Sequence, residues 1–488
     1  MGGESYCVSG QPSPSEPAVE LADIVVVGSG FAGIAAAIEA LEAGASVLVL
    51  EKMPEPGGNS VIDSGQLAVV GSPQQEAHRI HDSADLLAED ILVNGEHLND
   101  PLKVRYIAEH SHEVYEWVTS LGVRWASGVA AAGGHSIPRI LFTESGSGRE
   151  IHQALMRKFE SLGGKVRTNC FVDRILRGGN GTGRVEGLLV REGYRFPDAS
   201  SGTPVRILAR RAVILCHGGF AADVAYRQKM DSHLTPDLGT TNQPGATGEL
   251  WRETVRAGCE VLQAGWVQST PWNNPKEKGQ GIGWLFSEYA PPLYGLWIDS
   301  DGNRFVDETA NRKVRTEAIF EEHRRGRRVF CIAAEGCGKL LDSIYEGYLG
   351  TVLRRGIVQR FESLRELGEA LGIRPGGAEA AVKALNECIR ARKEDPFGRS
   401  LRRMKPLRSR RWLAAEMTPK VHHCMGGVMT TLSGEVLDAR TQLPMGGLYA
   451  AGECAGGVHG ACRITACAIL DCIAMGRLAG RTAAVGGA

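Results

Sequence analysis

The sequence lacks the signatures of several large protein classes. Its 488 residues include 12 cysteines but no C-x-x-C pair and no C-x-x-C-H, so no zinc site, disulfide framework or c-type haem is indicated, and no metal site is predicted. Such cysteine usage fits a reducing cytoplasm. No apolar run is long enough to cross a bilayer, and the N-terminus lacks the basic-then-apolar profile of a signal peptide. We expect residues 1–19 to form a disordered leader and the protein not to insert into a membrane.

The sequence also has no large excess of positive or negative charge. The net charge is −1 with 23% charged residues, which argues against a nucleic-acid binder and favours small-molecule partners. By contrast, glycine is abundant: 63 residues, as expected for a chain with many βα turns and close approaches of the backbone to a ligand. The length exceeds one typical core, so two domains are expected.

One stretch, 23–51, carries a complete βαβ pattern. A β-branched run, 24–27, leads into Gly28-Ser29-Gly30-Phe31-Ala32-Gly33, which is G-x-G-x-x-G at the junction of a strand and an Ala-rich helix over 34–43. In this motif the glycines permit a tight turn, let a pyrophosphate approach the backbone, and let the helix pack on the sheet. The helix N-terminus then faces the phosphates. A second strand, 46–50, ends in Glu51, which is placed to accept hydrogen bonds from ribose hydroxyls.

Later segments return to the same edge of the predicted sheet. Gly57-Gly58-Asn59-Ser60 leaves the end of the second strand, so it must lie beside the nucleotide. The region 150–220 is interpreted as a second βαβ-like return, in which the buried run 212–216 ends in His217-Gly218-Gly219. Near the C-terminus, the strand pattern 448–451 ends in Gly452-Glu453. The nucleotide domain is therefore predicted to be discontinuous.

The middle of the chain has a different composition. From about Gly265 it becomes rich in Trp and Pro and then in charged helical patterns, and this segment carries an excess of Lys and Arg. Such an excess would attract an anionic substrate, although a solvated basic surface explains it equally well. The predicted domains are 20–264 and 422–488 for the nucleotide and 265–421 for a capping, substrate-binding domain.

The order of motifs resembles a known family. GSGFAG, Glu51, GGNS, GNRFVDE, VHHCMGGV, GLYAAGE and GGVHGACR follow one another as in the flavoproteins of soluble fumarate reductases, urocanate reductases and tricarballylate dehydrogenase, which belong to the succinate dehydrogenase/fumarate reductase superfamily. The resemblance covers about 22–488 and is looser in 330–415. It implies an α/β fold, with a Rossmann-like FAD-binding domain of the glutathione-reductase type and an inserted α+β cap.

The resemblance also implies FAD, held without a covalent link because the segment after Gly57 offers no suitable histidine. An electron donor or acceptor outside the chain is then required. The residues predicted to bind FAD are Gly28, Gly30, Phe31, Ala32, Gly33, Glu51, Lys52, Gly57, Gly58, Asn59, Ser60, Gly65, Val172, Gly218, Gly219, Gly452, Glu453, Ala468 and Ile469.

In this family a substrate carboxylate lies between a histidine and an arginine, which correspond here to His422 and Arg463. Arginine offers carboxylate a planar bidentate fork, so the chemistry agrees. The adjacent His423 can exchange roles with His422 and is assigned to the substrate together with Thr270 and Tyr289. Thr270 replaces a histidine that clamps the far carboxylate in fumarate reductases, which makes fumarate itself a doubtful substrate.

The proton-delivering arginine of the reductases corresponds to Arg312 in DETANRKVR. Arginine rarely gives up a proton, so the role requires a buried, crowded site, and the alternative is that Arg312 only binds an anion. The family's proton path also uses a glutamate, here Glu288, and an arginine three residues later, here Pro291, so we expect the path to be interrupted. The flavin motif Arg-Leu-Gly-Gly-Asn-Ala appears as 463–468, RITACA, with side chains in place of the glycines.

The predicted function is hydride transfer between flavin N5 and the C=C or CH–CH unit of a small anionic or carbonyl-containing substrate. Resemblance to the soluble reductases favours an ene-reductase. Thr270, Trp272 and the missing arginine favour a dehydrogenase, of the tricarballylate or ketosteroid type, as the alternative. A flavoprotein that isomerises or merely binds its ligand is the third possibility, because of Thr465 and Cys467.

Overall fold

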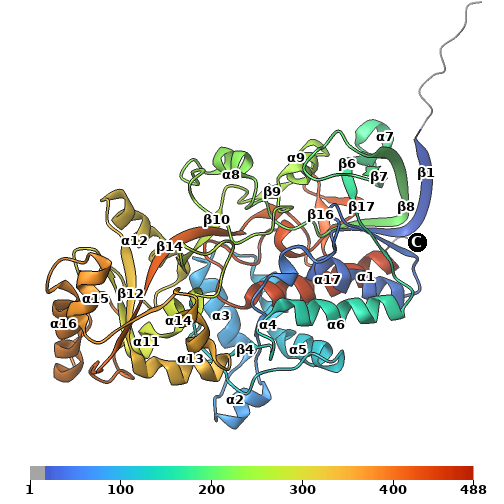
Figure 1. The fold of residues 1–488 in the computed structure, drawn as a ribbon. Coiled ribbons are helices and arrows are strands. Elements are labelled where there is room, and N and C mark those ends of the chain that lie inside the picture. The colour runs from blue at the N-terminus through green and yellow to red at the C-terminus, as the bar shows by residue number, and fades with distance from the viewer. Residues whose placement is uncertain (1–16, 487–488) are drawn as a thin grey trace, which may run out of the picture.

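The fold is built on the predicted βαβ unit (Figure 1). The computed structural model describes residues 17–486. Its strands are β1 (Ala18–Val27), β2 (Val47–Leu50), β3 (Gln66–Ala68), β4 (Ile140–Phe142), β5 (Val166–Arg167), β6 (Cys170–Arg177), β7 (Val185–Glu192), β8 (Thr203–Leu215), β9 (Val261–Leu262), β10 (Val267–Asn273), β11 (Gly295–Asp299), β12 (Val329–Ala334), β13 (Gln359–Phe361), β14 (Trp412–Cys424), β15 (Gly427–Val428), β16 (Glu435–Leu437) and β17 (Pro444–Ala450).

The helices connect and cover these strands. They are α1 (Phe31–Glu42), α2 (Pro73–Ala77), α3 (Ala84–Asn94), α4 (Pro101–Glu109), α5 (Ser111–Ser120), α6 (Gly148–Ser161), α7 (Gly178–Gly181), α8 (Val224–Met230), α9 (Glu249–Arg256), α10 (Trp284–Tyr289), α11 (Pro291–Tyr294), α12 (Arg312–Arg324), α13 (Gly338–Ile344), α14 (Tyr348–Arg354), α15 (Leu364–Leu371), α16 (Gly377–Ala391) and α17 (Cys467–Val485), with short 3₁₀ turns at 58–61, 335–337 and 452–454.

The larger sheet has eight strands. Five of them run parallel in the order β17-β8-β1-β2-β5, and β16 pairs antiparallel with β17 at the edge. The C-terminal part of β1 is buried because its residues Ile24–Val26 lie between covered faces, as is usual for parallel sheets. Helices α1, α6 and α17 lie together on one side of this sheet (Figure 1). The predicted α/β fold class is confirmed.

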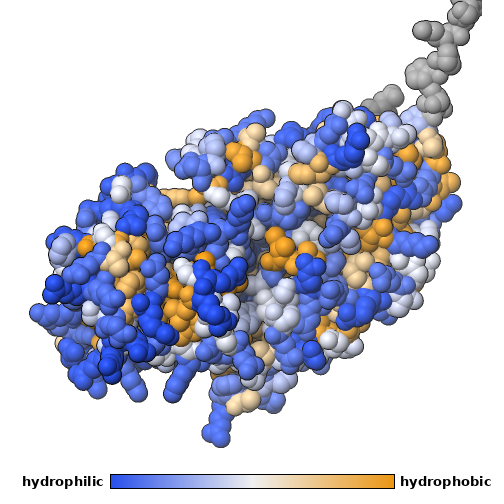
Figure 2. Space-filling model, in the orientation of Figure 1, coloured by the Kyte–Doolittle hydropathy of each residue, from blue (hydrophilic) through white to orange (hydrophobic). Residues whose placement is uncertain are grey.

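The smaller sheet is antiparallel. Its order is β10-β14-β12-β11, with β13 also paired to β14. Helices α15 and α16 bury Leu367, Leu371, Val382 and Leu385 in one hydrophobic cluster with strand residues such as Phe330. This sheet and these helices form the end of the molecule remote from β1 (Figure 1). Figure 2 shows a mostly hydrophilic face in which hydrophobic residues gather in small, scattered groups.

Three sequence expectations need correction. The predicted second βαβ return is parallel to the central strands only at β5 and β8, because β6 and β7 form an antiparallel meander that leads into β8. The predicted leader, 1–19, overlaps β1, which begins at Ala18; residues 1–16 of that leader lie outside the described residues. The predicted boundary between 421 and 422 falls inside β14, which continues to Cys424. The division into domains otherwise stays a prediction.

Candidate active site

A long cavity opens where the parallel strands end. Val27, Leu50 and Cys216, the last residues of β1 and β2 and the first after β8, lie in its wall, and it encloses about 1730 Å³, including open solvent at its mouth. This is the sheet edge at which open α/β folds bind ligands. Predicted site residues that line it are Gly28, Gly30, Phe31, Ala32, Glu51, Lys52, Gly57, Gly58, Asn59, Ser60, Val172, Gly218, Gly219, Thr270, Arg312, His422, His423, Glu453, Arg463, Ala468 and Ile469.

The glycine turn leaves no room for side chains. Gly28 has φ +102°, and a Cβ there would lie 2.3 Å from the carbonyl oxygen of Cys216. A Cβ at Gly33 would lie 1.9 Å from the carbonyl oxygen of Gly28. Helix α1 begins at Phe31, whose N–H donates to the Ser60 hydroxyl at 2.9 Å, and the preceding Gly30 has no side chain that could cap the following N–H groups. The turn therefore presents its remaining backbone donors to the cavity, as a pyrophosphate requires.

The acidic end of β2 is fixed by hydrogen bonds. Glu51 Oε2 accepts from the Ser29 hydroxyl at 2.6 Å and from the Ser29 N–H at 3.2 Å, while Oε1 accepts from the Met53 N–H at 2.9 Å. The Ser29 hydroxyl in turn accepts from the Gly57 N–H at 2.9 Å. These bonds tie the glycine turn, Glu51 and the 57–60 segment into one unit that lines the cavity.

Helix α17 reaches the cavity beside α1. The two helices pack in parallel with their backbones close together, since a Cβ at Gly476 would lie 2.5 Å from the Ala32 carbonyl oxygen and one at Gly480 2.2 Å from that of Ala36. Two helix N-termini, at Phe31 and Cys467, thus point toward the same cavity, and each favours negative charge. This arrangement fits a dinucleotide with a flavin, whose phosphates would lie at α1 and whose ring would lie near α17.

Two buried guanidinium groups stand at the other end of the cavity. Arg463 Nη1 donates to the carbonyl oxygen of Ile464 at 3.2 Å, and Arg312 Nη2 donates to the Thr465 hydroxyl at 3.0 Å. Arg463 Nε and Arg312 Nε and Nη1 have no hydrogen-bond partner among residues 17–486. Burial, followed by the charge of Arg463, lowers the pKa of Arg312 to about 9, and burial also lowers the pKa of Arg463.

The two histidines on β14 have different partners. His422 Nδ1 lies 2.7 Å from the Thr241 hydroxyl, whereas His423 Nδ1 lies 3.5 Å from Glu453 Oε1 and its Nε2 has no partner in the described chain. Burial, with the neighbouring arginine charges, holds the pKa of both histidines well below the usual range, so both are neutral at pH 7. Burial raises the pKa of Glu453 to about 7.

Glu288 is paired despite Pro291. Its carboxylate accepts two hydrogen bonds from Arg315, at 2.6 and 3.3 Å. Arg315 lies on α12 one turn after Arg312, and both guanidinium groups stack on the indole of Trp272, with their central carbons 4.7 and 4.9 Å from its ring centre. An arginine from another element therefore stands beside Glu288 although Pro291 supplies none, and the predicted interruption of the proton path stays a prediction.

Five predicted residues do not line the cavity: Gly33, Gly65, Gly452, Glu288 and Tyr289. The glycines are needed for packing; a Cβ at Gly65, for example, would lie 2.4 Å from the Thr143 hydroxyl oxygen. Tyr289 is buried against Phe142 and Trp284 and its hydroxyl has no partner in the part of the chain described. Thr270 lines the cavity but donates its hydroxyl hydrogen to Asn273.

Sequence reasoning missed several residues of the site. The loop 240–249 brings Thr241 and Asn242 to the cavity, where Asn242 Nδ2 donates to the His422 carbonyl oxygen at 2.8 Å and Asn59 Nδ2 donates to Asn242 Oδ1 at 2.5 Å. Its Thr, Asn, Pro and Gly content was the available signal. Gln280 and Trp284 line the substrate end, but nothing in their local pattern distinguishes them from other polar and aromatic residues.

Comparison with known proteins decides the family. The profile of the FAD binding domain family matches residues 23–469. The chain belongs to this family. The acrylate reductase flavoprotein subunit of Shewanella woodyi is 34% identical over 473 residues, covering 94% of this chain and 90% of that protein. The fumarate reductase (cytochrome) of Shewanella frigidimarina is also 34% identical, over 95% of this chain and 77% of its own length.

Solved structures agree with the fold. A flavocytochrome c3 fumarate reductase in an open conformation superposes with a TM-score of 0.74 and 26% identity, covering 96% of this chain and 79% of that one. The predicted family resemblance is confirmed, and so is FAD as the cofactor. The protein is an FAD-dependent oxidoreductase acting on CH–CH groups.

Two features are absent from residues 17–486. No helix there combines the length and the hydropathy needed to cross a membrane. No group of three or more His, Cys, Asp or Glu side chains in that range could hold a metal ion.

Proposed function

We propose that this protein reduces the C=C bond of a small 2-enoate that carries one carboxylate. The observation that supports this most strongly is the pair Arg312 and Arg463, which place unpartnered N–H donors at the end of a flavin-binding cavity. Buried cations are normally paired, so two guanidinium groups left with free donors indicate that an anion completes the site.

Arg463 and His422 would hold the carboxylate. The backbone of Arg463 is fixed by Gln268, whose Oε1 accepts from the Arg463 N–H at 2.7 Å and whose Nε2 donates to the Arg463 carbonyl oxygen at 3.2 Å. His422 is neutral, and its Nδ1 is engaged by Thr241, so its Nε2 is the nitrogen left for the substrate. A neutral imidazole beside a guanidinium adds a hydrogen bond without a second repelling charge.

When bound, FAD supplies a hydride to the carbon β to the carboxylate. Arg312 would then donate a proton to the α-carbon, which balances the reaction as the addition of H⁻ and H⁺ across the double bond to give the saturated acid. Burial and Arg463 favour this role because both lower the pKa of Arg312, and an arginine with a lowered pKa releases its proton more readily. Glu288 and Arg315 lie behind Arg312 and would restore the proton.

The rest of the substrate end favours a monocarboxylate. Thr270, Trp272, Gln280 and Trp284 are its neutral lining residues, and two of them are indoles. A second carboxylate would lie against this wall without a cationic partner, which is unfavourable. An apolar vinyl group needs no such partner. The acrylate reductase subunit among the relatives acts, by its name, on such a substrate.

Electrons for each turnover would come from an external donor. A cytoplasmic location stays a prediction that rests on cysteine usage.

Anaerobic single turnovers test the proposal. Holoenzyme reduced with dithionite is mixed with acrylate or fumarate, flavin reoxidation is followed by absorbance, and the product is identified by NMR. We expect acrylate to reoxidise the flavin and to yield propionate. Bleaching of the oxidised enzyme by propionate, with no reaction of acrylate, would indicate a dehydrogenase instead, and faster reoxidation by fumarate would contradict the single carboxylate. No redox reaction with any of these acids would favour the isomerase or ligand-binding alternative.

A further inference from the structure

A loop unconnected with any predicted motif packs against the start of α17. Gly133 and Gly134 have φ +53° and +104°, and Cβ atoms there would lie 2.3 Å from the Thr465 hydroxyl oxygen and 2.7 Å from Ile464 Cγ2. The Thr465 N–H donates to the Gly133 carbonyl oxygen at 3.4 Å. The two glycines therefore let the loop contact the segment that carries Arg463 and Thr465.

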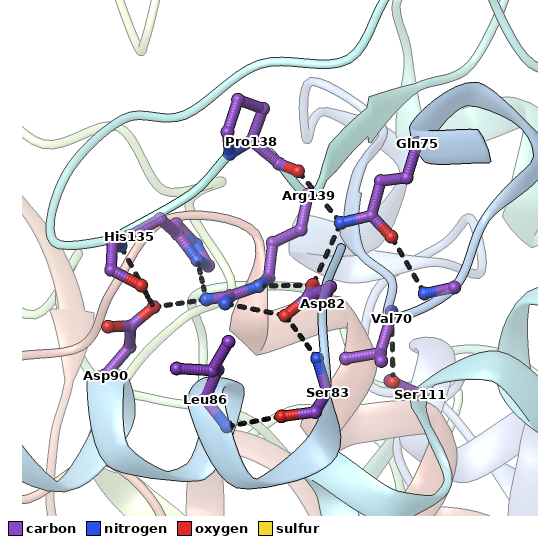
Figure 3. A network of polar contacts seen from close by, with 12 residues as sticks. Val70, Gln75, Asp82, Ser83, Leu86, Asp90, Ser111, His135, Pro138 and Arg139 are labelled. Atoms are coloured by element: carbon purple, nitrogen blue, oxygen red, sulfur yellow. Dashed lines mark hydrogen bonds and ion pairs between the residues drawn. The ribbon is translucent and has the colours of Figure 1, made fainter. Parts of the chain in front are cut away.

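His135, which follows these glycines, completes the contact. One ring nitrogen, Nε2, lies 2.7 Å from the Thr465 carbonyl oxygen. The other, Nδ1, lies 3.1 Å from Arg139 Nη1, and Figure 3 shows this second contact. A carbonyl can only accept and a guanidinium can only donate, so His135 must carry its proton on Nε2 and accept at Nδ1. Burial, followed by the charge of Arg139, lowers the pKa of His135 to about 4, so the ring stays neutral.

Arg139 is itself held rigidly. Its Nε and Nη2 donate to the two oxygens of Asp82 at 2.9 and 3.0 Å, and Nη1 also donates to Asp90 on α3. The side chain is fully buried. Arg139 therefore fixes the tautomer and the orientation of His135. Its own guanidinium group is held by a bidentate pair with Asp82, which is a strong arrangement for arginine and a carboxylate.

The last step leads to the cavity. Thr465 receives at its hydroxyl the hydrogen bond from Arg312 Nη2, at 3.0 Å, while the indole of Trp272 lies against the guanidinium, with its ring centre 4.9 Å from the central carbon. A glycine stands at the position of Thr465 in the flavin motif that the sequence resembles, and a glycine has no hydroxyl to accept this bond.

We propose that Thr465 and His135 are positioning residues for Arg312. Arg139 fixes His135, His135 fixes the Thr465 carbonyl, and the Thr465 hydroxyl fixes one end of the guanidinium, so that Nε and Nη1 of Arg312 stay free for the substrate. The inference rests on the proposed function, in which Arg312 donates the proton. Under this proposal the loop 133–139 influences the reaction through Thr465 and Arg312, although none of its residues reaches the substrate.

Thr465→Val and Thr465→Ser provide the first test. Valine has nearly the shape of threonine but no hydroxyl, so we expect kcat to fall about 10-fold or more, the usual effect of losing a hydrogen bond to a charged group, with a smaller change in KM. Serine restores the hydroxyl and should recover most of that loss. Equal losses of kcat in the two variants would overturn the proposal, because the effect would then come from packing and not from the hydroxyl. A wild-type kcat in Thr465→Val would overturn it as well, because the hydroxyl would not be needed.

The pH profile gives a readout that packing alone would not move. The charged and titratable groups around Arg312 are Arg463, Glu288, Arg315, Cys462, Asp63, Tyr289, His422 and His423, all unchanged in these variants. Loss of the acceptor destabilises the cationic form of Arg312, so the alkaline limb of kcat should move to lower pH in Thr465→Val and stay in place in Thr465→Ser. If the alkaline limb of kcat in Thr465→Val stays at the wild-type pH, the proposal is contradicted.

His135→Leu and His135→Gln test the other end. Leucine removes both hydrogen bonds and should lower kcat in the same direction as Thr465→Val, whereas the glutamine amide offers a donor and an acceptor and should restore part of it. His112→Leu is the matched control, since His112 also lies at hydrogen-bonding distance from a backbone carbonyl, that of Val70 at 3.1 Å, away from the cavity. An equal fall in kcat in the control would sink the proposal.

A crystal structure of the Thr465→Val holoenzyme separates this inference from the proposed function. The guanidinium of Arg312 should leave its place against Trp272, whatever substrate the enzyme uses. An unmoved Arg312 would overturn the positioning role even if acrylate is reduced. A displaced Arg312 in an enzyme that reduces no enoate would uphold the positioning role and reject the proposed function.

Discussion

Two sets of buried arginines in this protein have opposite surroundings. The first set, the cap ion cluster, consists of Arg304 and Arg399 with the carboxylates of Glu308 and Asp395. Glu308 Oε2 lies 2.8 Å from Arg304 Nη2 and 3.0 Å from Arg399 Nη1. Asp395 accepts a further hydrogen bond from Arg304. The second set consists of the cavity arginines, Arg312 and Arg463. No carboxylate within residues 17–486 lies within ion-pair distance of either guanidinium group.

The contrast recurs within one helix. Arg315 lies a single turn after Arg312 on α12, yet it makes a bidentate pair with Glu288 while Arg312 retains two unpartnered nitrogens. Desolvating a cation is costly, so paired arginines recover that cost within the fold and unpaired ones must recover it from a ligand. The comparison therefore indicates a role in stability for the first set and supports the proposed role of the second in substrate binding and reaction.

The largest effect is expected from breaking the cap ion cluster. Glu308→Ala removes the acceptor shared by Arg304 and Arg399 and leaves both cations buried, so the free energy of unfolding should fall by about 3–5 kcal/mol. Urea unfolding measures this. The kcat of the folded, FAD-loaded fraction should stay near the wild-type value. A loss below about 1 kcal/mol would show that the cluster does not hold the fold.

Arg312→Ala should show the reverse behaviour. We expect kcat to fall by at least ~100-fold, which corresponds to about 2.7 kcal/mol in the activation barrier, because a general acid is lost. The urea midpoint and FAD binding should not fall, because no ion pair is broken. Arg312→Lys keeps a charge and a transferable proton, so its recovery separates acid chemistry from guanidinium geometry. Near-normal kcat in Arg312→Ala would reduce Arg312 to anion binding.

Arg463→Lys should mainly affect KM. Lysine keeps the charge but not the bidentate fork, and losing a hydrogen bond to a charged group costs about 1.5–3 kcal/mol, or roughly 10–100-fold. Steady-state kinetics with acrylate separates KM from kcat. If kcat falls while KM stays constant, Arg463 acts on the transition state and not on the bound carboxylate.

The pH dependence of kcat follows from the lowered pKa of Arg312. The acid must be protonated to act, so kcat should be constant below a pH of about 9 and should fall up to ~10-fold per pH unit above it. In Glu308→Ala the same alkaline limb should remain. A kcat that stays constant to pH 10.5 would exclude Arg312 as the titrating acid.

The smallest effect is expected at an exposed ion pair on α15. Arg365 Nε lies 2.9 Å from Glu369 Oε1, and both side chains are mostly in solvent. Glu369→Ala should change the free energy of unfolding by less than ~0.5 kcal/mol and should leave kcat unchanged. A loss as large as that in Glu308→Ala would mean that burial is not what separates strong pairs from weak ones.

The sequence predicted the nucleotide end of the site well because its signals are local. The G-x-G-x-x-G turn, Glu51 and the 57–60 segment are each recognisable within a few residues, and the structure brings them together at one sheet edge. Family resemblance added Arg312, His422 and Arg463, which meet at the other end of the same cavity.

The rest could not be predicted because it depends on distant residues meeting in space. Arg315 comes to Glu288 from another helix, and β14 runs across the predicted boundary between 421 and 422, so that His422 and His423 lie on a strand shared with the predicted cap. His135 is separated from Thr465 by 330 residues, and no local pattern marks their contact. Nothing in the sequence distinguishes Gly476 from other helical glycines, and its close contact with α1 becomes evident only in the structure.

The most direct test compares acrylate with acrylamide, which has the same double bond and nearly the same size but a neutral amide in place of the carboxylate. Both are mixed with the reduced holoenzyme, and flavin reoxidation is followed by absorbance at pH 7. If the cavity arginines are left unpaired for a substrate anion, acrylate should reoxidise the flavin at least ~100-fold faster, since two charge-assisted hydrogen bonds are lost with the amide. Equal rates for the two compounds would contradict this account of the site.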